Sequence, residues 1–250
     1  MRILITASGG GHTGYAVAIA QRLKNKAELI FAVPEGDEWS ASKVRKYGEV
    51  IHIRKARGPK DPLWRSIPGL AKAFLQSIRR IGQVDVVIAT GSNHCVPPSI
   101  VGKLKGAKLI AIESSVRFTK ASLSIKTLTP LTDVLALQWP EQKLLHKKGT
   151  VVGPIYELPE YEPWDGGYIL VTGGTYGHKA LFDAISELNI ENVVLQTGKV
   201  NPEPYRRKHP TWKIFNFDPE FGKWLAGAKV VITHFGKTAI DAVLSYRKQQ

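Results

Sequence analysis

The amino terminus joins a short apolar run directly to a cluster of glycines. Residues 3–7 are largely apolar, and Gly9-Gly10-Gly11-His12-Thr13-Gly14 follows. Apolar side chains then recur at helical spacing as far as residue 26. A strand that passes through a tight glycine loop into a helix is typical of folds built on a parallel β-sheet. This order of elements constrains the fold more than any other feature of the chain.

The same alternation continues through the first half of the chain. Strands are expected at 29–33, 50–53, 84–89, 109–112 and 134–138, and helices at 39–47, 66–81 and 97–104. The expected strands are apolar on both faces. We therefore predict an α/β fold whose parallel sheet is covered by helices on both sides.

A proline-rich stretch divides the sequence. Pro154, Pro159 and Pro163 lie in a segment without periodicity, which is the composition of a linker. The pattern then starts afresh with a strand at 168–172 and a second glycine loop. Further strands are expected at 193–196, 214–217 and 230–233, and helices at 179–188, 220–226 and 238–244. We predict two Rossmann-like, doubly wound domains at 1–153 and 167–250, joined by a linker at 154–166.

The charge of the chain limits its partners. Thirty-five Lys and Arg against 21 Asp and Glu leave a net charge of +14, which favours anionic partners such as diphosphates, acidic lipids or nucleic acid. Nucleic acid is disfavoured because aromatic residues are not interleaved with the basic ones in a recognisable module. Cys95 is the only cysteine, so no internal disulfide forms and a reducing cytoplasm fits best. The first apolar run is too short for a signal peptide or a membrane span.

The first glycine loop allows three interpretations. It matches G-x-G-x-x-G, with Glu35 roughly twenty residues on, as in nicotinamide- or flavin-binding folds. A phosphate cradle for another ligand and a plain strand-to-helix turn are the alternatives. His12 argues against the redox interpretation because a titratable imidazole suits an arriving hydroxyl or diphosphate, although it could be a polar turn residue beside a Thr13 cap.

Glu113 follows an apolar strand and is therefore expected at the same sheet edge as the first glycine loop. A carboxylate desolvated on one side could act as a base. It could equally cap a helix or pair with Arg117. The basic, hydroxyl-rich stretch 117–126 suits a diphosphate or is a solvated loop.

Two further features bear on ligands. The predicted helix 66–81 has an apolar stripe that either contacts an anionic membrane or packs on its own sheet. Trp64 and the basic residues Arg54, Lys55, Arg57 and Lys60 are the better membrane candidates. The histidines are scattered and no D-x-D run is present, so we expect no metal or other cofactor.

Several clusters together resemble a known enzyme family. They are Gly10-Gly11-His12-Thr13, Cys95-Val96-Pro97, Glu113-Ser114 with Arg117, Leu123-Ser124, Pro130 with Asp133, and Gln138-Trp139-Pro140. This first half is similar to the membrane-anchor subunit of the UDP-N-acetylglucosamine transferase of asparagine-linked glycosylation. Residues 171–175, 195–198 and 231–236 resemble the catalytic subunit of the same enzyme. The combination is similar to fused bacterial and archaeal forms and, more distantly, to the bacterial lipid II synthase.

The resemblance implies an inverting GT-B glycosyltransferase that moves N-acetylglucosamine from UDP-GlcNAc to a polyprenyl-diphosphate-linked sugar. It implies His12 and Glu113 as catalytic residues, with Glu113 taking the proton and His12 orienting the diphosphate or relaying the proton. The implied acceptor-binding residues are Gly10, Gly11, Thr13, Ser114 and Arg117. The implied donor-binding residues are Gly173, Gly174, Thr175, His234, Gly236, Thr238 and Asp241. His234 could instead be a buried structural histidine.

The chain departs from the family in two places. Asp241 stands one position early for the usual ribose-binding glutamate, and the second domain is short, which implies that its C-terminal part is missing. The alternative function is a non-catalytic scaffold that recruits a separate transferase to the membrane. We expect a peripheral protein on the cytoplasmic face of the membrane. The sequence leaves open whether the chain associates with a second copy of itself or with a partner subunit.

Overall fold

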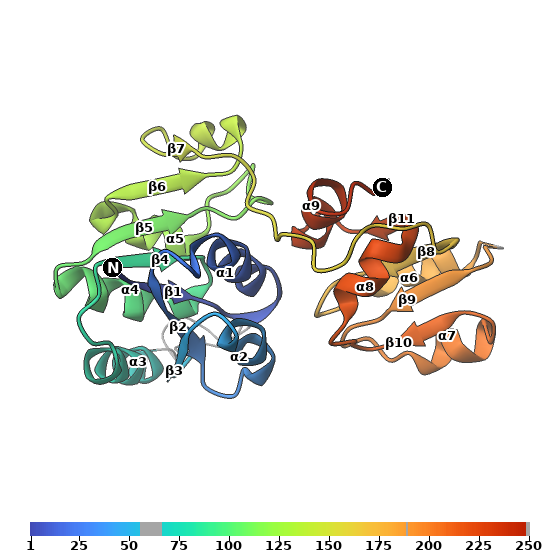
Figure 1. Ribbon diagram of the computed structural model, residues 1–250, viewed down its shortest axis with the longest axis horizontal. Helices are drawn as coiled ribbons and strands as arrows, with labels where there is room; N and C mark the ends of the chain where they lie inside the picture. Colours follow the sequence, from blue (N-terminus) through green and yellow to red (C-terminus); the bar gives the residue numbers. More distant parts are fainter. Residues whose placement is uncertain (56–66, 189, 249–250) are drawn as a thin grey trace. The chain divides into compact units, whose positions relative to one another are not determined.

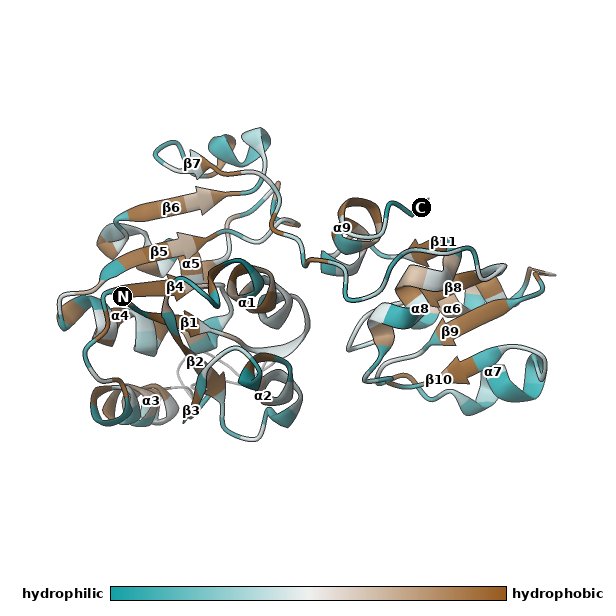
Figure 2. Cartoon of the chain, in the orientation of Figure 1, coloured by the Kyte–Doolittle hydropathy of each residue, from teal (hydrophilic) through white to brown (hydrophobic). Residues whose placement is uncertain are grey.

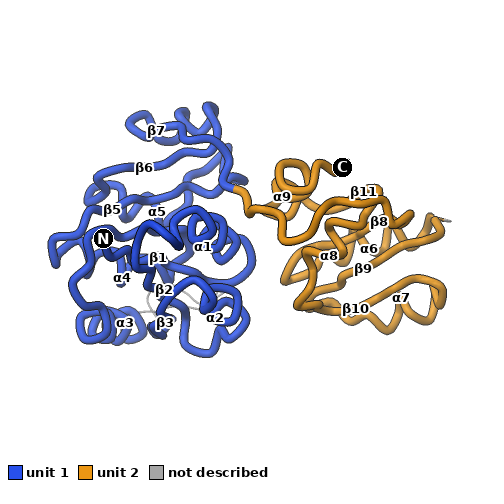
Figure 3. Tube along the Cα trace, in the orientation of Figure 1, with its two compact units in different colours: residues 1–155 blue, residues 156–250 orange. Residues whose placement is uncertain are grey.

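The computed structural model describes residues 1–55, 67–188 and 190–248. The chain divides into two compact units, residues 1–155 and 156–250 (Figure 3). In each unit, helices pack on both faces of a parallel sheet (Figure 1). The predicted α/β class is therefore confirmed.

Seven strands form the sheet of unit 1. They are β1 (Arg2–Thr6), β2 (Glu28–Pro34), β3 (Glu49–Ile53), β4 (Val86–Ala89), β5 (Lys108–Ile112), β6 (Val134–Leu137) and β7 (Thr150–Val151). Their order is β3-β2-β1-β4-β5-β6-β7, and every neighbouring pair is parallel. Ile5 of β1 lies opposite Phe31 of β2 and Ile88 of β4. The chain moves outward from β1 in one direction and resumes at β4 in the other, so the sheet has a topological switch point between these strands.

The helices of unit 1 cover the two faces of this sheet. They are α1 (Gly9–Leu23), α2 (Glu38–Arg45), α3 (Ile67–Arg80), α4 (Val96–Leu104) and α5 (Leu123–Leu128). Side chains of α1 and α2 form one apolar core with the sheet, and those of α3, α4 and α5 form the other. The strands are almost uniformly apolar because both of their faces are buried (Figure 2).

Unit 2 repeats the plan with four strands. They are β8 (Tyr168–Thr172), β9 (Val193–Gln196), β10 (Lys213–Phe215) and β11 (Ala228–Thr233), in the order β10-β9-β8-β11 and all parallel. Helices α6 (Lys179–Ser186) and α7 (Glu203–Lys208) share one core, and α8 (Phe221–Gly227) and α9 (Lys237–Leu244) share the other. The switch point lies between β8 and β11.

The sequence did not predict β7, α5 and α7. Their segments are too brief to show a periodicity. Residues 156–166, expected as part of a linker, lie along unit 2 instead. Trp164 N–H donates to the carbonyl of Ala226 at 3.0 Å, and the hydroxyl of Ser245 donates to the carbonyl of Glu157 at 2.5 Å. The prolines correctly indicate an irregular path, and most of the segment is exposed, but its backbone is hydrogen-bonded to unit 2.

Candidate functional site

Hydrogen bonds join the loops after β1 and β4 at the switch point of unit 1. Thr90 N–H donates to the Thr6 hydroxyl at 3.0 Å, and the hydroxyls of Ser8 and Ser92 lie 2.6 Å apart. These contacts link positions 84 residues apart in the chain. They hold the first glycine loop against the loop that begins at Thr90.

His12 lies where these two loops meet. Its Nδ1 atom is 2.7 Å from the carbonyl oxygen of Thr90, so Nδ1–H is the donor. Burial lowers the pKa of His12 below its usual 6.5, and the charge of Arg117 acts in the same direction. The Thr90 hydrogen bond and the Glu113 charge oppose that shift. The imidazole is therefore neutral at pH 7, with its lone pair on Nε2.

Gly91 makes room for this ring. Its φ is +113°, and a Cβ atom added there would lie 2.5 Å from Cε1 of His12. Only glycine combines that backbone conformation with so close an approach. Within the described part of the chain, Nε2 has no hydrogen-bond partner. This nitrogen is available to a ligand.

The first glycine loop is held from the side of α2. Gly9 N–H donates to Asp37 Oδ2 at 2.9 Å, and the buried Thr13 hydroxyl is 2.7 Å from that of Ser40. The Gly9 N–H is therefore already bonded to a carboxylate. The Thr13 hydroxyl contacts Ser40 and does not act as a free helix cap. Gly10 bends the start of α1 with φ 8° and ψ −108°, and Gly11 is exposed.

Glu35, considered above as a ribose ligand, accepts a hydrogen bond from the amide of Gln76 at 2.8 Å. It also lies 3.9 Å from the guanidinium of Arg80. The structure therefore gives Glu35 structural partners at the edge of the sheet.

Glu113 is fully buried at the end of β5. Its Oε1 accepts from Ser114 N–H at 2.9 Å and from the Ser122 hydroxyl at 2.7 Å. Its Oε2 accepts from Ser122 N–H at 3.1 Å and from His146 Nε2 at 2.8 Å. All four contacts use the lone pairs that a general base needs. The expectation of a half-exposed base is therefore revised: the carboxylate holds the ends of its own loop.

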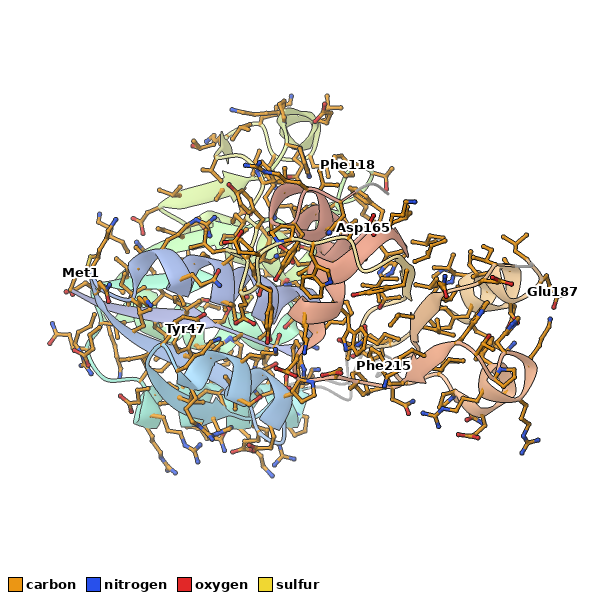
Figure 4. The ribbon with its side chains drawn as sticks, turned by 45° about the vertical axis from the view of Figure 1, so that its right-hand side comes forward. Met1, Tyr47, Phe118, Asp165, Glu187 and Phe215 are labelled. Atoms are coloured by element: carbon orange, nitrogen blue, oxygen red, sulfur yellow. The ribbon has the colours of Figure 1, made fainter. Side chains whose placement is uncertain are left out.

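A second group of contacts fixes the backbone of the loop that follows β5. The amide of Gln142 donates to the carbonyls of Ser114 and Arg117, at 2.7 and 3.0 Å, and Trp139 Nε1 donates to that of Ser115 at 2.9 Å. Ser114 is half-buried and Arg117 is exposed. Figure 4 labels Phe118, which belongs to this loop.

The second glycine loop, residues 173–178, packs against the turn after β9. A Cβ on Gly198, whose φ is +60°, would lie 2.7 Å from the Thr175 carbonyl oxygen, and one on Gly173 would overlap the backbone of Gly177 and His178. Gly174 has φ +67° and lies beside the ring of His234. The loop can have this compact path only because these positions lack side chains.

The loop after β11 completes the carboxyl edge of unit 2. His234 is exposed, and its ring centroid is 6.2 Å from that of His178. Partial burial lowers the pKa of His234, and the neighbouring His178 lowers it further. Gly236 precedes the first turn of α9, and Thr238 is half-buried within that turn. The structure thus brings Gly173, Gly174, Thr175, His234, Gly236 and Thr238 to one edge.

Internal contacts hold the Asp241 side chain. It is buried, pairs with Lys237 one turn earlier in α9, and accepts from Glu157 N–H at 3.0 Å. Its carboxylate therefore holds the segment before β8 against α9. The carboxylate of Asp241 is therefore already occupied, so it is not a free group for the ribose contact that was predicted from the sequence.

Sequence reasoning missed Thr90, Gly91 and His146. The only signal for the first two was the Thr-Gly pair directly after an apolar strand, at a position that the parallel order places at the same edge as His12. His146 lies in a short segment without periodicity. No group of three His, Cys, Asp or Glu side chains in the described residues is arranged to hold a metal ion. None of the described helices is long and apolar enough to cross a bilayer.

Comparisons with known proteins match both units. Residues 3–155 match the family described as oligosaccharide biosynthesis protein Alg14 like, and residues 168–249 match the glycosyltransferase family 28 C-terminal domain. A mouse protein named UDP-N-acetylglucosamine transferase subunit ALG14 is 29% identical over 182 residues, covering 62% of this chain and 83% of the relative.

A second relative extends across both units. The UDP-N-acetylglucosamine–N-acetylmuramyl-(pentapeptide) pyrophosphoryl-undecaprenol N-acetylglucosamine transferase of Lawsonia intracellularis is 28% identical over 223 residues. The match covers 79% of this chain and 60% of the relative, so the chain spans less than two thirds of that enzyme.

The fold has a solved counterpart in Acinetobacter baumannii MurG, with a TM-score of 0.64 at 18% identity over 98% of this chain and 76% of MurG. This similarity confirms the predicted GT-B fold. Since the Alg14-like match covers more than half of its length, the chain belongs to the Alg14-like family of oligosaccharide biosynthesis proteins, and its second unit carries a glycosyltransferase family 28 C-terminal segment.

Proposed function

We propose that this protein is an inverting glycosyltransferase that moves N-acetylglucosamine from UDP-GlcNAc to a sugar carried on a polyprenyl diphosphate. The names of both relatives specify N-acetylglucosamine transfer, and that of the Lawsonia enzyme specifies an acceptor on pyrophosphoryl-undecaprenol. In this proposal unit 1 binds the lipid-linked acceptor and unit 2 binds the nucleotide sugar. The product belongs to the synthesis of lipid-linked oligosaccharides.

The observation that carries the proposal is the state of His12. A neutral imidazole with its proton fixed on Nδ1 has its Nε2 lone pair free, as a general base requires. The ring lies at the switch point of the sheet, where ligands of such folds bind. Because Gly91 has no side chain, the ring has space to occupy this position.

The reaction balances with this single base. The acceptor hydroxyl oxygen attacks the anomeric carbon of UDP-GlcNAc from the side opposite to UDP, a new carbon–oxygen bond forms, and the bond to the diphosphate breaks. The hydroxyl proton passes to His12 Nε2, and UDP leaves with the electron pair. Attack from the opposite side inverts the anomeric configuration. Arg117, exposed on the loop after β5, is proposed to bind the acceptor diphosphate.

Unit 2 offers a site for the UDP leaving group. We propose that the diphosphate binds at the start of α9, where the positive end of the helix dipole follows Gly236 and the half-buried Thr238 adds a hydroxyl. The compact loop 173–178 forms the other side of this site. These groups would stabilise the negative charge that develops as UDP departs.

The outer face of α3 supports peripheral contact with a membrane. Ile67, Leu75 and Ile78 are 66%, 54% and 52% exposed, although they are large apolar residues. The small side chains of Ala73 and Ser77 face the sheet instead. Lys72 and Arg79 are exposed on the same helix, a combination that suits an anionic lipid surface.

The other membrane candidates lie in part outside the described residues. Arg57, Lys60 and Trp64 fall in the segment 56–66, whereas Arg54 and Lys55 are exposed beside it. Cys95 is buried and forms no disulfide. A reducing compartment, and so the cytoplasmic face, is proposed on this ground.

The membrane contact can be tested by flotation with vesicles. Ile67→Asp/Ile78→Asp should abolish binding to vesicles that contain anionic phospholipid and leave the chain folded. The control, Leu188→Asp, places the same charge on an exposed leucine of unit 2 and should bind like the wild type. Equal binding of all three proteins would overturn the role of α3.

The scaffold alternative rests on the first unit, since the mouse relative is named as a subunit of a transferase. A direct experiment separates the two functions. The whole chain is incubated with radiolabelled UDP-GlcNAc and a polyprenyl-diphosphate-linked N-acetylglucosamine, and label in the organic phase is counted. Transfer by the chain alone supports the enzyme. Transfer only after a separate transferase subunit is added supports the scaffold, and no transfer in either case contradicts both.

A further inference from the structure

We propose that His146 is a positioning residue: its hydrogen bond to the buried Glu113 carboxylate closes the loop 114–122 and so holds Ser115 against Tyr15, the neighbour of His12, and with it the position of Arg117 on the same loop. The inference rests on the proposed function for its consequence in the reaction, but its structural content can be measured without turnover. Neither His146 nor its contact with Glu113 is indicated by the sequence pattern.

The Glu113 carboxylate joins the two ends of this loop. Ser114 N–H and Ser122 N–H, eight residues apart, donate to its two different oxygens at 2.9 and 3.1 Å. The Ser122 hydroxyl adds a third contact at 2.7 Å. One buried anion thus replaces the backbone pairing that would otherwise close such a loop. Hydrogen bonds to an ionised acceptor are the stronger ones, so this closure is firm.

His146 supplies the contact that comes from outside the loop. Its Nε2–H donates to Glu113 Oε2 at 2.8 Å, and both side chains are almost wholly shielded from water, at 5% and 0% exposure. His146 is itself fixed, since its backbone N–H donates to the carbonyl of Gln142 at 3.0 Å. A buried carboxylate without this partner would lose one of its four donors and turn toward the others.

The charges of Arg117 on this loop and of Glu113 beneath it affect His12, the proposed base. The charge of Arg117 lowers the pKa of His12, and the charge of Glu113 raises it. Tyr15, whose ring centroid is 6.3 Å from that of His12, has its hydroxyl 2.6 Å from the Ser115 hydroxyl. Movement of the loop would therefore displace Arg117 and also break the contact between Ser115 and Tyr15 beside His12.

Glu113 and His146 do not reach the acceptor in this account. Their side chains are buried and bonded to each other and to the loop. The reaction depends on them through the geometry of residues 114–117. A catalytic role for Glu113 predicts a different outcome: loss of His146 would change the rate of the chemical step, not the binding of the acceptor.

Hydrogen–deuterium exchange on the full chain tests the positioning directly. In His146→Ala, the amides of Ser114 and Ser122 should exchange about tenfold to a hundredfold faster, as expected when a buried charged hydrogen bond is lost. His146→Gln retains a side-chain N–H at similar reach and should restore most of the protection. His209→Ala removes a histidine in unit 2 that contacts Ser186, and it should leave both amides unchanged.

Steady-state kinetics test the consequence. His146→Ala should raise the KM for the lipid-linked acceptor about tenfold or more while the KM for UDP-GlcNAc stays within twofold, and His146→Gln should recover acceptor binding. Unchanged exchange at Ser114 and Ser122 in His146→Ala would overturn the inference. Faster exchange with an unchanged acceptor KM would also overturn it. Absence of turnover in the wild type would contradict the proposed function alone, because the exchange measurement still decides the role of His146.

Discussion

The Nδ1 atom of His12 lies 2.7 Å from the carbonyl oxygen of Thr90, across the switch point of the first sheet. This contact fixes which nitrogen of the ring carries the proton. Because a carbonyl can only accept, the proton stays on Nδ1 and the lone pair on Nε2. A backbone atom thus performs the orienting role that a carboxylate has in many catalytic histidines.

The pH dependence of the reaction should reflect this ring. Burial lowers the pKa of His12, so its base form is present above that pKa and is lost as the pH falls through it. We expect kcat/KM for the acceptor to be constant at neutral pH and to fall on a limb below pH 6.5. The Arg117 charge lowers the same pKa. Arg117→Ala should therefore move the limb of kcat to higher pH, and a limb that stays in place would contradict the assignment.

Gly91 is predicted to be essential for the position of His12. In Gly91→Ala the new Cβ would lie 2.5 Å from the ring, which must move. A displacement of this kind should lower kcat by about a hundredfold while UDP binding is unchanged. Gly106→Ala is the matched control, because Gly106 has a similar φ of +98° with no atom within 4 Å. Similar kcat values for the two variants would show that backbone strain, not the clash, is responsible.

Gly198 should govern donor binding in the same way. Gly198→Ala would force the turn after β9 away from the Thr175 carbonyl oxygen, so the glycine loop of unit 2 would open. We expect UDP affinity, measured by titration calorimetry, to fall by about tenfold or more. Gly167→Ala provides the control: its φ is +72°, with no atom within 4 Å. Wild-type UDP affinity in Gly198→Ala would remove this loop from the proposed donor site.

His94 should make the protein sensitive to acid. Its Nε2–H donates to the Ala32 carbonyl at 3.1 Å, its Nδ1 is buried without a partner, and burial lowers its pKa to about 4. The unfolded chain binds the proton near pH 6.5, so the contribution of His94 to stability is present above pH 6.5 and is lost as the pH falls toward 4. The free energy of unfolding should drop by about 3 kcal/mol over this range from His94.

Urea denaturation at a series of pH values checks that figure. His94→Gln retains a side-chain donor but does not titrate. The fall in the free energy of unfolding between pH 6.5 and 4 should therefore be smaller in this variant by about 3 kcal/mol. His52→Gln changes a half-buried histidine of the same unit and should show the full drop. An identical pH dependence in His94→Gln and the wild type would contradict the prediction.

Much of the fold could be predicted because each strand and each long helix of a parallel α/β sheet has its own recognisable pattern of apolar residues. Apolar runs such as 109–112, alternating with helical stripes, indicated both sheets and the restart at Tyr168. His12 was singled out because it lies in a glycine loop directly after a strand, and the family resemblance then implied its role. The short elements α5 and α7 were not found, since six residues carry too little periodicity to distinguish a helix from a loop.

The environment of Glu113 could not be predicted from the sequence. Its position after a strand was correctly placed at the carboxyl edge, but its burial depends on Ser122 and His146, which converge on it from 9 and 33 residues away. The same limit applies to Asp241, whose partner segment around Glu157 precedes it by 84 residues. Prolines in that segment indicated a linker, whereas contacts with α9 decide its path.

The most direct test of the account is the rate of N-acetylglucosamine transfer by His12→Gln. Glutamine fills a similar space and can still donate a hydrogen bond to Thr90, but it offers no basic nitrogen. With wild-type affinities for UDP-GlcNAc and the lipid-linked acceptor verified separately, kcat should fall by about a hundredfold or more. A kcat within a few fold of the wild type would show that His12 does not take the acceptor proton.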